Sequence, residues 1–221
     1  MTSEFSRSRQ RREREREHRC QTILDAAESL FVDQGFLKTS VDQIADKAEV
    51  SVGTVYFYFK NKEALLSDLF DKSLFLLRSI LGKKFETAPT PLKGMEMAGH
   101  AFFDEFCTRH SQNAMILFRE AVSHGQHMES RRKKMSQAIA IDLSHAIERL
   151  GRESGHNFTS PESPLVFAHC ILGVYEKLAF HYLTDPQSPE QKKAMAQNAV
   201  EFTLGGIQQI TEPSSRKFQS Q

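Results

Sequence analysis

The stretch GFLKTSVDQIADKAEVSVGTVYFYFKNKEALL, residues 35–66, decides the fold of this chain because it holds two short helix signals with a turn between them. Ser40, followed three residues later by Gln43, is a capping box and predicts a helix over residues 40–48. A second cap and an apolar pair four residues apart predict another helix over residues 51–59. Two such helices, packed on a longer one before them, are the outline of a helix-turn-helix unit.

Amphipathic helix patterns extend outward from this unit in both directions. Apolar residues at helical spacing from Ile23 to Phe31, with Gly35 after them, predict a helix before the unit. Asn61 is the cap candidate of a long helix after it. Further apolar stripes at helical spacing, separated by loop signals, cover residues 90–106, 115–122, 135–150, 165–182 and 188–210. No window alternates with period two between hairpin turns, so the sequence predicts an all-α fold of about nine helices.

The overall charge excludes a general affinity for nucleic acid or anionic membranes. The formal net charge is +1, and residues 1–62 hold eleven Lys+Arg against ten Asp+Glu. Contacts with nucleic acid are therefore expected to depend on the placement of a few donors. Three widely spaced cysteines without a CxxC pair, and a first segment without an apolar signal, favour the cytoplasm. The longest apolar run, ten residues from Leu165, is too short to span a membrane.

The second short helix offers groups suited to DNA. Gly53 and Thr54 are small and stand at its start, where backbone and a hydroxyl can approach base edges. Tyr56 and Tyr58 carry phenol groups suited to phosphate oxygens. Lys62 follows at the start of the next helix, where free amide N–H groups favour anions.

The aromatic run at 56–59 is expected to divide between two faces. Phe59 lies four residues after Val55 and is expected to join the core with it. The two tyrosines are expected at the DNA backbone. Phe57 is expected either along the groove wall or against a sugar.

Residues 35–66 resemble the DNA-binding head of the TetR family of transcriptional regulators. The family's pattern of Gly-aromatic, Thr-Ser, Ile-Ala, Val-Ser, Tyr-x-x-Phe and Lys-Glu-x-Leu stands here as Gly35-Phe36, Thr39-Ser40, Ile44-Ala45, Val50-Ser51, Tyr56 to Phe59 and Lys62-Glu63-Ala64-Leu65. The helical pattern downstream also resembles the ligand-binding and dimerising body of that family. The resemblance implies four segments: a charged arm at 1–18, a helix-turn-helix DNA-binding domain at 19–64, a ligand-binding and dimerisation domain at 65–211, and a flexible tail at 212–221.

The resemblance also implies roles for individual residues of the head. Positions that hold phosphates are occupied by Ser40, Tyr56, Tyr58 and Lys62. Positions that can face bases are occupied by Gln43, Val52, Gly53 and Thr54, and the cap Ser51 and the ring of Phe57 complete the predicted DNA-binding set. Val52 is expected to be exposed, although its spacing of three from Val55 would also let it join the core.

One residue departs from the family pattern. Glu49 stands in the turn where the family often has glycine. If this position requires a left-handed backbone, glutamate costs about 1–2 kcal/mol there.

The charged segment at 7–19 has seven arginines and three glutamates and almost nothing apolar. It is expected either as a solvated helical extension or disordered arm, or as a basic arm that contacts phosphates or enters a minor groove.

In the body, apolar and aromatic stripes are the candidate walls of an effector pocket, with ordinary core packing as the alternative for each of them. The candidates are Phe103, Phe106, Phe118, Ile139, Leu143, Phe167, Cys170 and Tyr175. Walls of this kind favour an apolar or aromatic small molecule. The last two long helices, broadly apolar and carrying Gly173, Gly205 and Gly206, predict a two-fold homodimer.

The predicted function is therefore a repressor that binds a palindromic operator in double-stranded DNA as a dimer and is released by an effector. An activator or effector-independent DNA binder, and a helical enzyme or carrier with an incidental helix-turn-helix, are the alternatives. No catalytic constellation and no cofactor loop stands out, so we expect no enzyme and no cofactor. His124 and His127 lack further ligands at metal spacing, so no metal site is expected either.

Overall fold

A computed structural model describes residues 2–123 and 125–211 of the chain, and within them it confirms the all-α fold: nine α-helices and no strand. The helices are α1 (Thr2–Gln34), α2 (Val41–Lys47), α3 (Val52–Tyr58), α4 (Lys62–Thr87), α5 (Pro91–Ala101), α6 (Ser111–Phe118), α7 (Gly125–Glu153), α8 (Ser163–Thr184) and α9 (Pro189–Thr211). A π-helical segment, η1 (Phe102–Arg109), continues α5, and a short 3₁₀ helix, η2 (Glu120–Ser123), follows α6.

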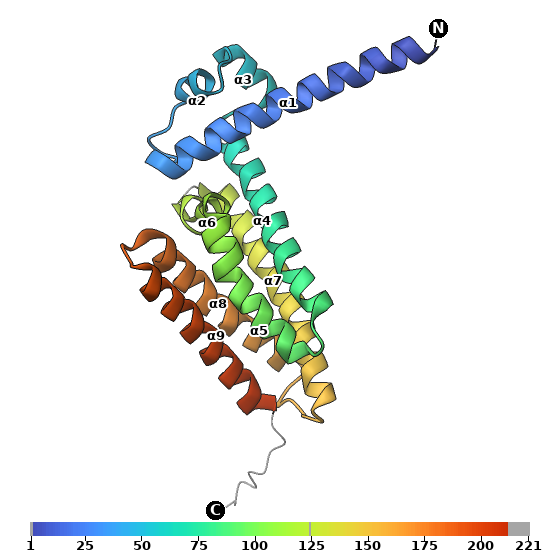
Figure 1. Ribbon diagram of the computed structural model, residues 1–221, viewed down its shortest axis with the longest axis vertical. Coiled ribbons are helices and arrows are strands. Elements are labelled where there is room, and N and C mark those ends of the chain that lie inside the picture. Colours follow the sequence, from blue (N-terminus) through green and yellow to red (C-terminus); the bar gives the residue numbers. More distant parts are fainter. Residues whose placement is uncertain (1, 124, 212–221) are drawn as a thin grey trace, which may run out of the picture.

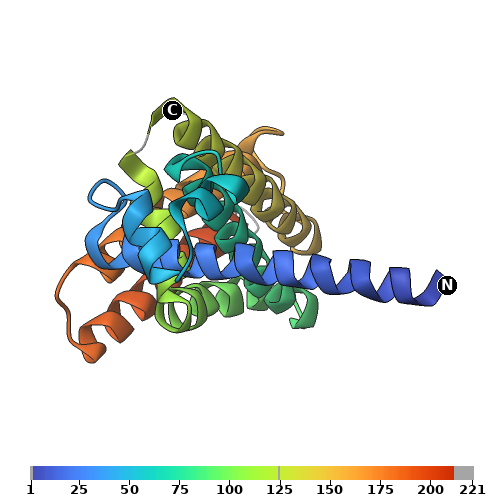
Figure 2. The same ribbon diagram turned by 90° about the horizontal axis from the view of Figure 1, so that it is seen from above.

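The helices form a head and a body (Figure 1). The head consists of α1, α2 and α3 at one end of the molecule, and the body of α4 to α9. The N-terminal half of α1 projects away from the rest of the chain, as the view from above also shows (Figure 2). The predicted boundary between residues 64 and 65 falls inside α4, which runs unbroken from the head into the body.

The predicted caps define the starts of the helices. The Gln43 N–H donates to Ser40 Oγ over 3.2 Å, and the Ser40 N–H donates to Gln43 Oε1 over 2.8 Å, which is a complete capping box. Asn61 Oδ1 accepts from the first turn of α4. These bonds satisfy amide groups that the helix itself leaves unpaired, so short helices can begin at these residues.

The turn between α2 and α3 is a Schellman motif. The Val50 N–H donates to the Ala45 carbonyl oxygen over 3.0 Å, and the Glu49 N–H donates to that of Asp46 over 3.1 Å. Such a motif places its C′ residue in the left-handed region, and Glu49 has a φ of +54°. Glutamate therefore occupies a backbone conformation that favours glycine.

A shared hydrophobic core joins the head to the upper body. Fully buried Ile23 and Phe31 from α1, Ile44 from α2 and Val55 from α3 belong to the same apolar cluster as Leu69 of α4. A second cluster lies in the lower body around Ala140, Ile147 and Ala168. Burial of apolar area, at about 25 cal/mol per Å2, means that the first cluster helps to hold the head on the body.

Two further expectations concern the chain's surface. Residues 7–19, for which a helical extension was one expectation, form part of α1. No described helix combines the length and the apolar character that a bilayer crossing requires. The described residues also contain no group of three or more His, Cys, Asp or Glu able to hold a metal ion, while His124 and the side chain of His127 lie outside them.

Candidate nucleic-acid interface and effector cavity

Helix α3 divides its aromatic rings between core and solvent. Val55 and Phe59 are buried, as predicted from their spacing. Tyr56 is 53% exposed and Phe57 73% exposed, so a large apolar ring stands in water beside a phenol. Tyr58 is half-buried, and its ring meets the Phe57 ring edge to face at 5.1 Å. This pair fixes the direction of Phe57 on the exposed face, where a sugar or a base could contact it.

The N-terminus of α3 carries small and polar groups. Ser51 Oγ accepts from the Thr54 N–H over 3.1 Å and lies 2.8 Å from Thr54 Oγ1. Gly53 is exposed, and a Cβ built on it would meet no atom nearer than 3.8 Å. The backbone at Gly53 is therefore open to a ligand that comes close to the helix end.

The N-terminus of α2 presents Ser40 and Gln43, both exposed. Besides capping Ser40, Gln43 Oε1 accepts a hydrogen bond of 3.0 Å from Gln34 Nε2. The carbonyl end of Gln43 is thus occupied by the protein, and only its NH2 group stays available as a donor to a base.

Val52 differs from the expectation of exposure. It is half-buried and packs against the core cluster, because the first turn of α3 brings it onto the same side as Val55. Its contact with a base stays a prediction for the part of the side chain that remains exposed.

Lys62, predicted to hold a phosphate, is bound to the chain itself. Its Nζ donates hydrogen bonds of 2.7 Å to the carbonyl oxygens of Phe36 and Thr39 and lies 4.3 Å from the centre of the Phe36 ring. Burial lowers the pKa of this ammonium group. Two of its three N–H donors are used in this way, so a phosphate contact stays a prediction for the third alone. Lys60, two residues earlier, is exposed and was missed, although the sequence Lys-Asn-Lys places it just before α4.

The body encloses a cavity of about 280 Å3 between α4, α5, α7, α8 and α9. Its wall is mostly apolar, and four of the predicted ligand contacts line it: Phe118, Ile139, Leu143 and Tyr175. Close approach of α5 shapes one side, since a Cβ on Gly99 would come 2.5 Å from the Tyr175 hydroxyl oxygen. The cavity is at the small end of the roughly 300–1,000 Å3 common for ligand sites.

The other four predicted contacts lie elsewhere. Phe103 and Phe106 are fully buried in the core that joins head and body and do not line this cavity. Their rings pack on the lining residues Tyr175 and Phe118 from the side of the core. Phe167 and Cys170 line a separate, more open hollow on α8 and α9. The shared helical spacing of these residues could not reveal which helix each of them faces.

Polar groups reach the cavity at a few points. Arg78 of α4 donates to Asp142 of α7 over 2.6 Å at its edge. Burial raises the pKa of the Tyr175 phenol, and its oxygen lies 3.4 Å from Thr203 Oγ1. Burial likewise raises the pKa of Glu176, another lining residue. A ligand here would be held mainly by apolar contact and oriented by few polar atoms.

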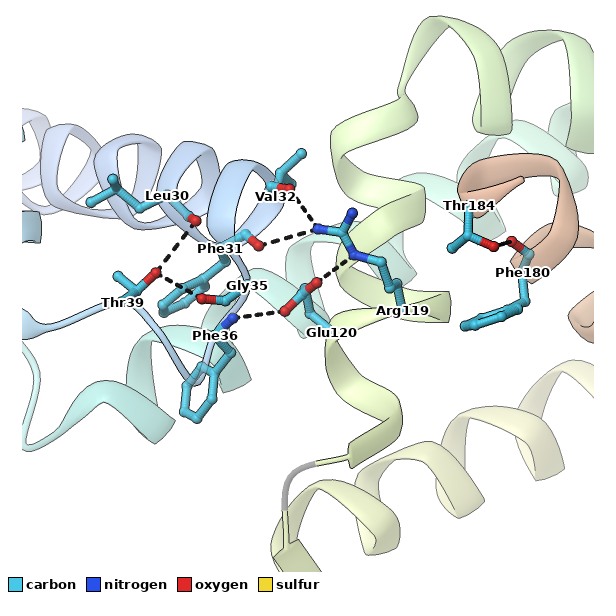
Figure 3. A network of polar contacts seen from close by, with 10 residues as sticks. All are labelled: Leu30, Phe31, Val32, Gly35, Phe36, Thr39, Arg119, Glu120, Phe180 and Thr184. Atoms are coloured by element: carbon cyan, nitrogen blue, oxygen red, sulfur yellow. Dashed lines mark hydrogen bonds and ion pairs between the residues drawn. The ribbon is translucent and has the colours of Figure 1, made fainter. Parts of the chain in front are cut away.

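Directly after the cavity-lining residue Phe118, the side chains of Arg119 and Glu120 bind the head (Figure 3). The Arg119 guanidinium donates to the carbonyl oxygens of Phe31 at 3.2 Å and Val32 at 2.5 Å, at the C-terminal end of α1. Its Nε pairs with Glu120 Oε1 at 2.5 Å, and Glu120 Oε2 accepts from the Phe36 N–H over 2.8 Å. Glu120 is buried. We call Arg119 and Glu120 the latch, because they hold the end of α1 and the turn after it.

A second polar junction lies between the same parts of the chain. Asn113 Nδ2 of α6 donates to Glu28 Oε1 of α1 over 3.0 Å and to Ser73 Oγ of α4 over 3.2 Å. Burial raises the pKa of Glu28. No local sequence pattern marks either junction, because Phe36 and Glu120 lie 84 residues apart and Glu28 and Asn113 lie 85 residues apart.

Comparisons with known proteins agree with this architecture. Residues 23–69 match the family model for "Bacterial regulatory proteins, tetR family". YhgD of Bacillus subtilis, an HTH-type transcriptional regulator, is 29% identical over 186 residues, which are 83% of this chain and 93% of that protein. The structure of the transcriptional regulator FadR from Bacillus subtilis with stearoyl-CoA superposes with a TM-score of 0.72 at 18% identity, covering 84% of this chain and 98% of that one. AibR in complex with isovaleryl coenzyme A and operator DNA gives a TM-score of 0.66 at 19% identity over 83% of this chain and 97% of that one.

Proposed function

The chain belongs to the TetR family of transcriptional regulators, and from this premise we propose that it is a dimeric repressor that binds a palindromic operator and is released by a small apolar effector. Its DNA-binding groups are the exposed residues on α2 and α3, with Lys60 and the start of α4 beside them. Such a protein acts where the chromosome is, in the cytoplasm.

One observation carries the proposal of effector control. Phe118 lines the cavity, and the next two residues along the chain are the latch that holds the head. A ligand that moves Phe118 therefore acts on the backbone of Arg119 and Glu120 without any intermediate element. Since a ligand shifts an equilibrium only by binding two states differently, the state with an altered latch must be the one it prefers.

The cavity defines the effector's chemical class. Its lining is dominated by leucine, isoleucine, methionine and phenylalanine side chains, with Arg78 at the edge on α4 and Arg149 on α7. Two structural relatives were solved with acyl thioesters of coenzyme A. A short acyl chain or a small aromatic molecule, with any anionic part near the arginines, fits both the volume and the lining.

The dimer is proposed through α8 and α9. Phe202 is 70% exposed and Val166 54% exposed on their outer faces. Gly173 and Gly205 lie on the same faces, and a Cβ at either would meet no atom within 4 Å. A helical glycine costs about 1 kcal/mol, and nothing in one protomer offsets it there, whereas close helix packing against a second copy could.

The operator is tested by footprinting the purified protein on DNA around its own gene. A protected palindrome with half-sites about 34–36 Å apart, or a multiple of that, is expected for a symmetric dimer. No protected palindrome at physiological salt would overturn the proposal.

The cavity is tested by filling it at Gly82, which lines it and whose Cβ would meet no atom within 4 Å. Gly82→Leu should fold and bind operator but lose the rise in melting temperature and the DNA release that acyl-CoA thioesters or small aromatic compounds cause. Ser79→Leu, an exposed change on the same helix outside the lining, is the matched control. An unchanged ligand response in Gly82→Leu would place the effector elsewhere.

The dimer face is tested with two exposed phenylalanines. Phe202→Glu should give monomers in light scattering, whereas Phe75→Glu, at a side chain 77% exposed on α4, should leave the dimer intact. Equal behaviour of the two variants would reject α8 and α9 as the interface.

A further inference from the structure

The first half of α1 is an unsupported helix. Residues 9–19 are all exposed, and packing on the core begins only with half-buried Cys20. At 1.5 Å per residue, the part before Cys20 extends about 27 Å beyond the head. A helix that is polar all round gains nothing from burial, so its chain must be stabilised by side-chain pairs or by a binding partner.

The arginines of this arm form two ridges. The first contains Arg9, Arg12, Arg16 and Arg19, spaced by three, four and three residues and therefore on one face. Fourteen residues after Arg9, the same face carries Ile23, which is fully buried in the head. This inner ridge is thus a direct continuation of the surface by which α1 packs under the helix-turn-helix unit.

The second ridge contains Arg11 and Arg14 on the opposite face. Arg11 pairs with Glu15 at 3.0 Å. Fourteen residues after Arg11, this outer face carries the carboxylate of Asp25, with Asp33 two turns further on. None of the four inner arginines forms an ion pair with a side chain that the structure describes, so no such carboxylate neutralises the charge of the inner ridge.

The position of the arm relates it to the DNA-facing side. The arm leaves the head sideways beyond α3, the helix that is proposed to face DNA (Figure 1). Helices α8 and α9, which carry the proposed dimer face, lie on the other side of the molecule. In a dimer built through them, each arm points outward from the two-fold axis, along the flank of the half-site.

We propose that the inner ridge of α1 binds the phosphate backbone of the DNA that flanks each operator half-site. This inference rests on the proposed operator binding. Arginines on one helical face, one or two turns apart, can follow successive phosphates, and such contacts add affinity without reading sequence. They also explain how a head of almost balanced charge binds a polyanion, since its excess charge is sorted onto one face.

The ridges are tested against each other in the full-length protein. R12Q/R16Q removes two inner charges, and R11Q/R14Q removes the same charge from the outer ridge. Each lost phosphate contact lowers the slope of log K against log salt by about 0.9, so the inner variant should lose about 3.6 in a dimer with two arms. The outer variant should keep the wild-type slope.

The length of the flank gives a second readout. An arm of about 27 Å reaches about eight base pairs at 3.4 Å each. Wild type should therefore bind an operator with ten extra base pairs on each side of the palindrome more tightly than one cut at the outer edge of the palindrome. R12Q/R16Q, which keeps only Arg9 and Arg19 of the inner ridge, should show a smaller difference between the two fragments, whereas R11Q/R14Q should keep the wild-type difference.

The possible results separate the two proposals. Equal salt slopes for the inner and outer variants, or no effect of flank length on wild type, would overturn the role of the inner ridge while operator binding stands. No specific binding by wild type to either fragment would overturn the proposed function itself.

Discussion

Replacing Glu49 by glycine should stabilise the protein and leave its fold unchanged. Glu49 is the C′ residue of the Schellman motif between α2 and α3 and has a φ of +54°. A side chain in this region costs about 1–2 kcal/mol, because Cβ comes too close to the following carbonyl oxygen. Glycine removes that cost but has a more flexible unfolded chain, which costs about 0.4–1 kcal/mol. We expect a net gain of about 0.5–1 kcal/mol.

Thermal unfolding can measure this gain. For a chain of this length, 1 kcal/mol corresponds to about 2–4 °C in melting temperature, so Glu49→Gly should melt about 1–4 °C higher at equal protein concentration. Glu49→Ala is the matched control, since it removes the carboxylate and keeps the Cβ. Glu49→Asn should fall between them, because asparagine tolerates the left-handed region.

The charge of Glu49 has a separate effect. This exposed carboxylate precedes α3, the helix that is proposed to face DNA, where it would repel phosphates. Glu49→Gln and Glu49→Gly should therefore both tighten operator binding at low salt, although only the glycine variant gains stability. If Glu49→Gly melted no higher than Glu49→Ala, the conformational argument would be refuted.

Four further substitutions test the junctions between head and body and the lysines of the head. Glu120→Gln removes the buried charge that pairs with half-buried Arg119. It should lower the free energy of unfolding by about 2 kcal/mol in urea and weaken effector-induced DNA release; unchanged release would separate the latch from the effector response. Lys62→Met should cost about 2–3 kcal/mol, because two carbonyl oxygens lose a charged donor, whereas Lys60→Met should leave unfolding unchanged and reduce the salt slope of DNA binding. The reverse pattern in the two assays would restore Lys62 as the main phosphate ligand. Burial raises the pKa of Glu28, so the folded state binds the proton of this carboxyl group more tightly than the unfolded state does. The stability that this protonation contributes is present below the unfolded pKa and is lost as pH rises to the folded pKa. Glu28→Gln should therefore stabilise the protein more at about pH 7 than at about pH 4 in urea unfolding, and an equal effect at both would contradict the shift.

The local elements of this fold could be predicted from the sequence because each depends on residues a few positions apart. Ser40 with Gln43, and Ser51 with Thr54, form caps within one turn. The spacing of Val55 and Phe59 predicted correctly that both are buried. The turn at Glu49 could be anticipated as well, since its strain is a property of one residue's backbone.

Only the tertiary structure decided which of these residues are free to act. Lys62 has the spacing of a phosphate ligand, yet the carbonyl oxygens of Phe36 and Thr39, between α1 and α2, take two of its three donors. Phe103 and Tyr175 each belong to an apolar stripe at helical spacing, yet only Tyr175 lines the cavity. The packing of the helices determines what each ring contacts. The latch joins Glu120 to Phe36 across 84 residues of sequence. Periodicity determines which face of a helix is apolar, whereas the packing of whole helices determines what that face touches, and this second fact connects the cavity to the head.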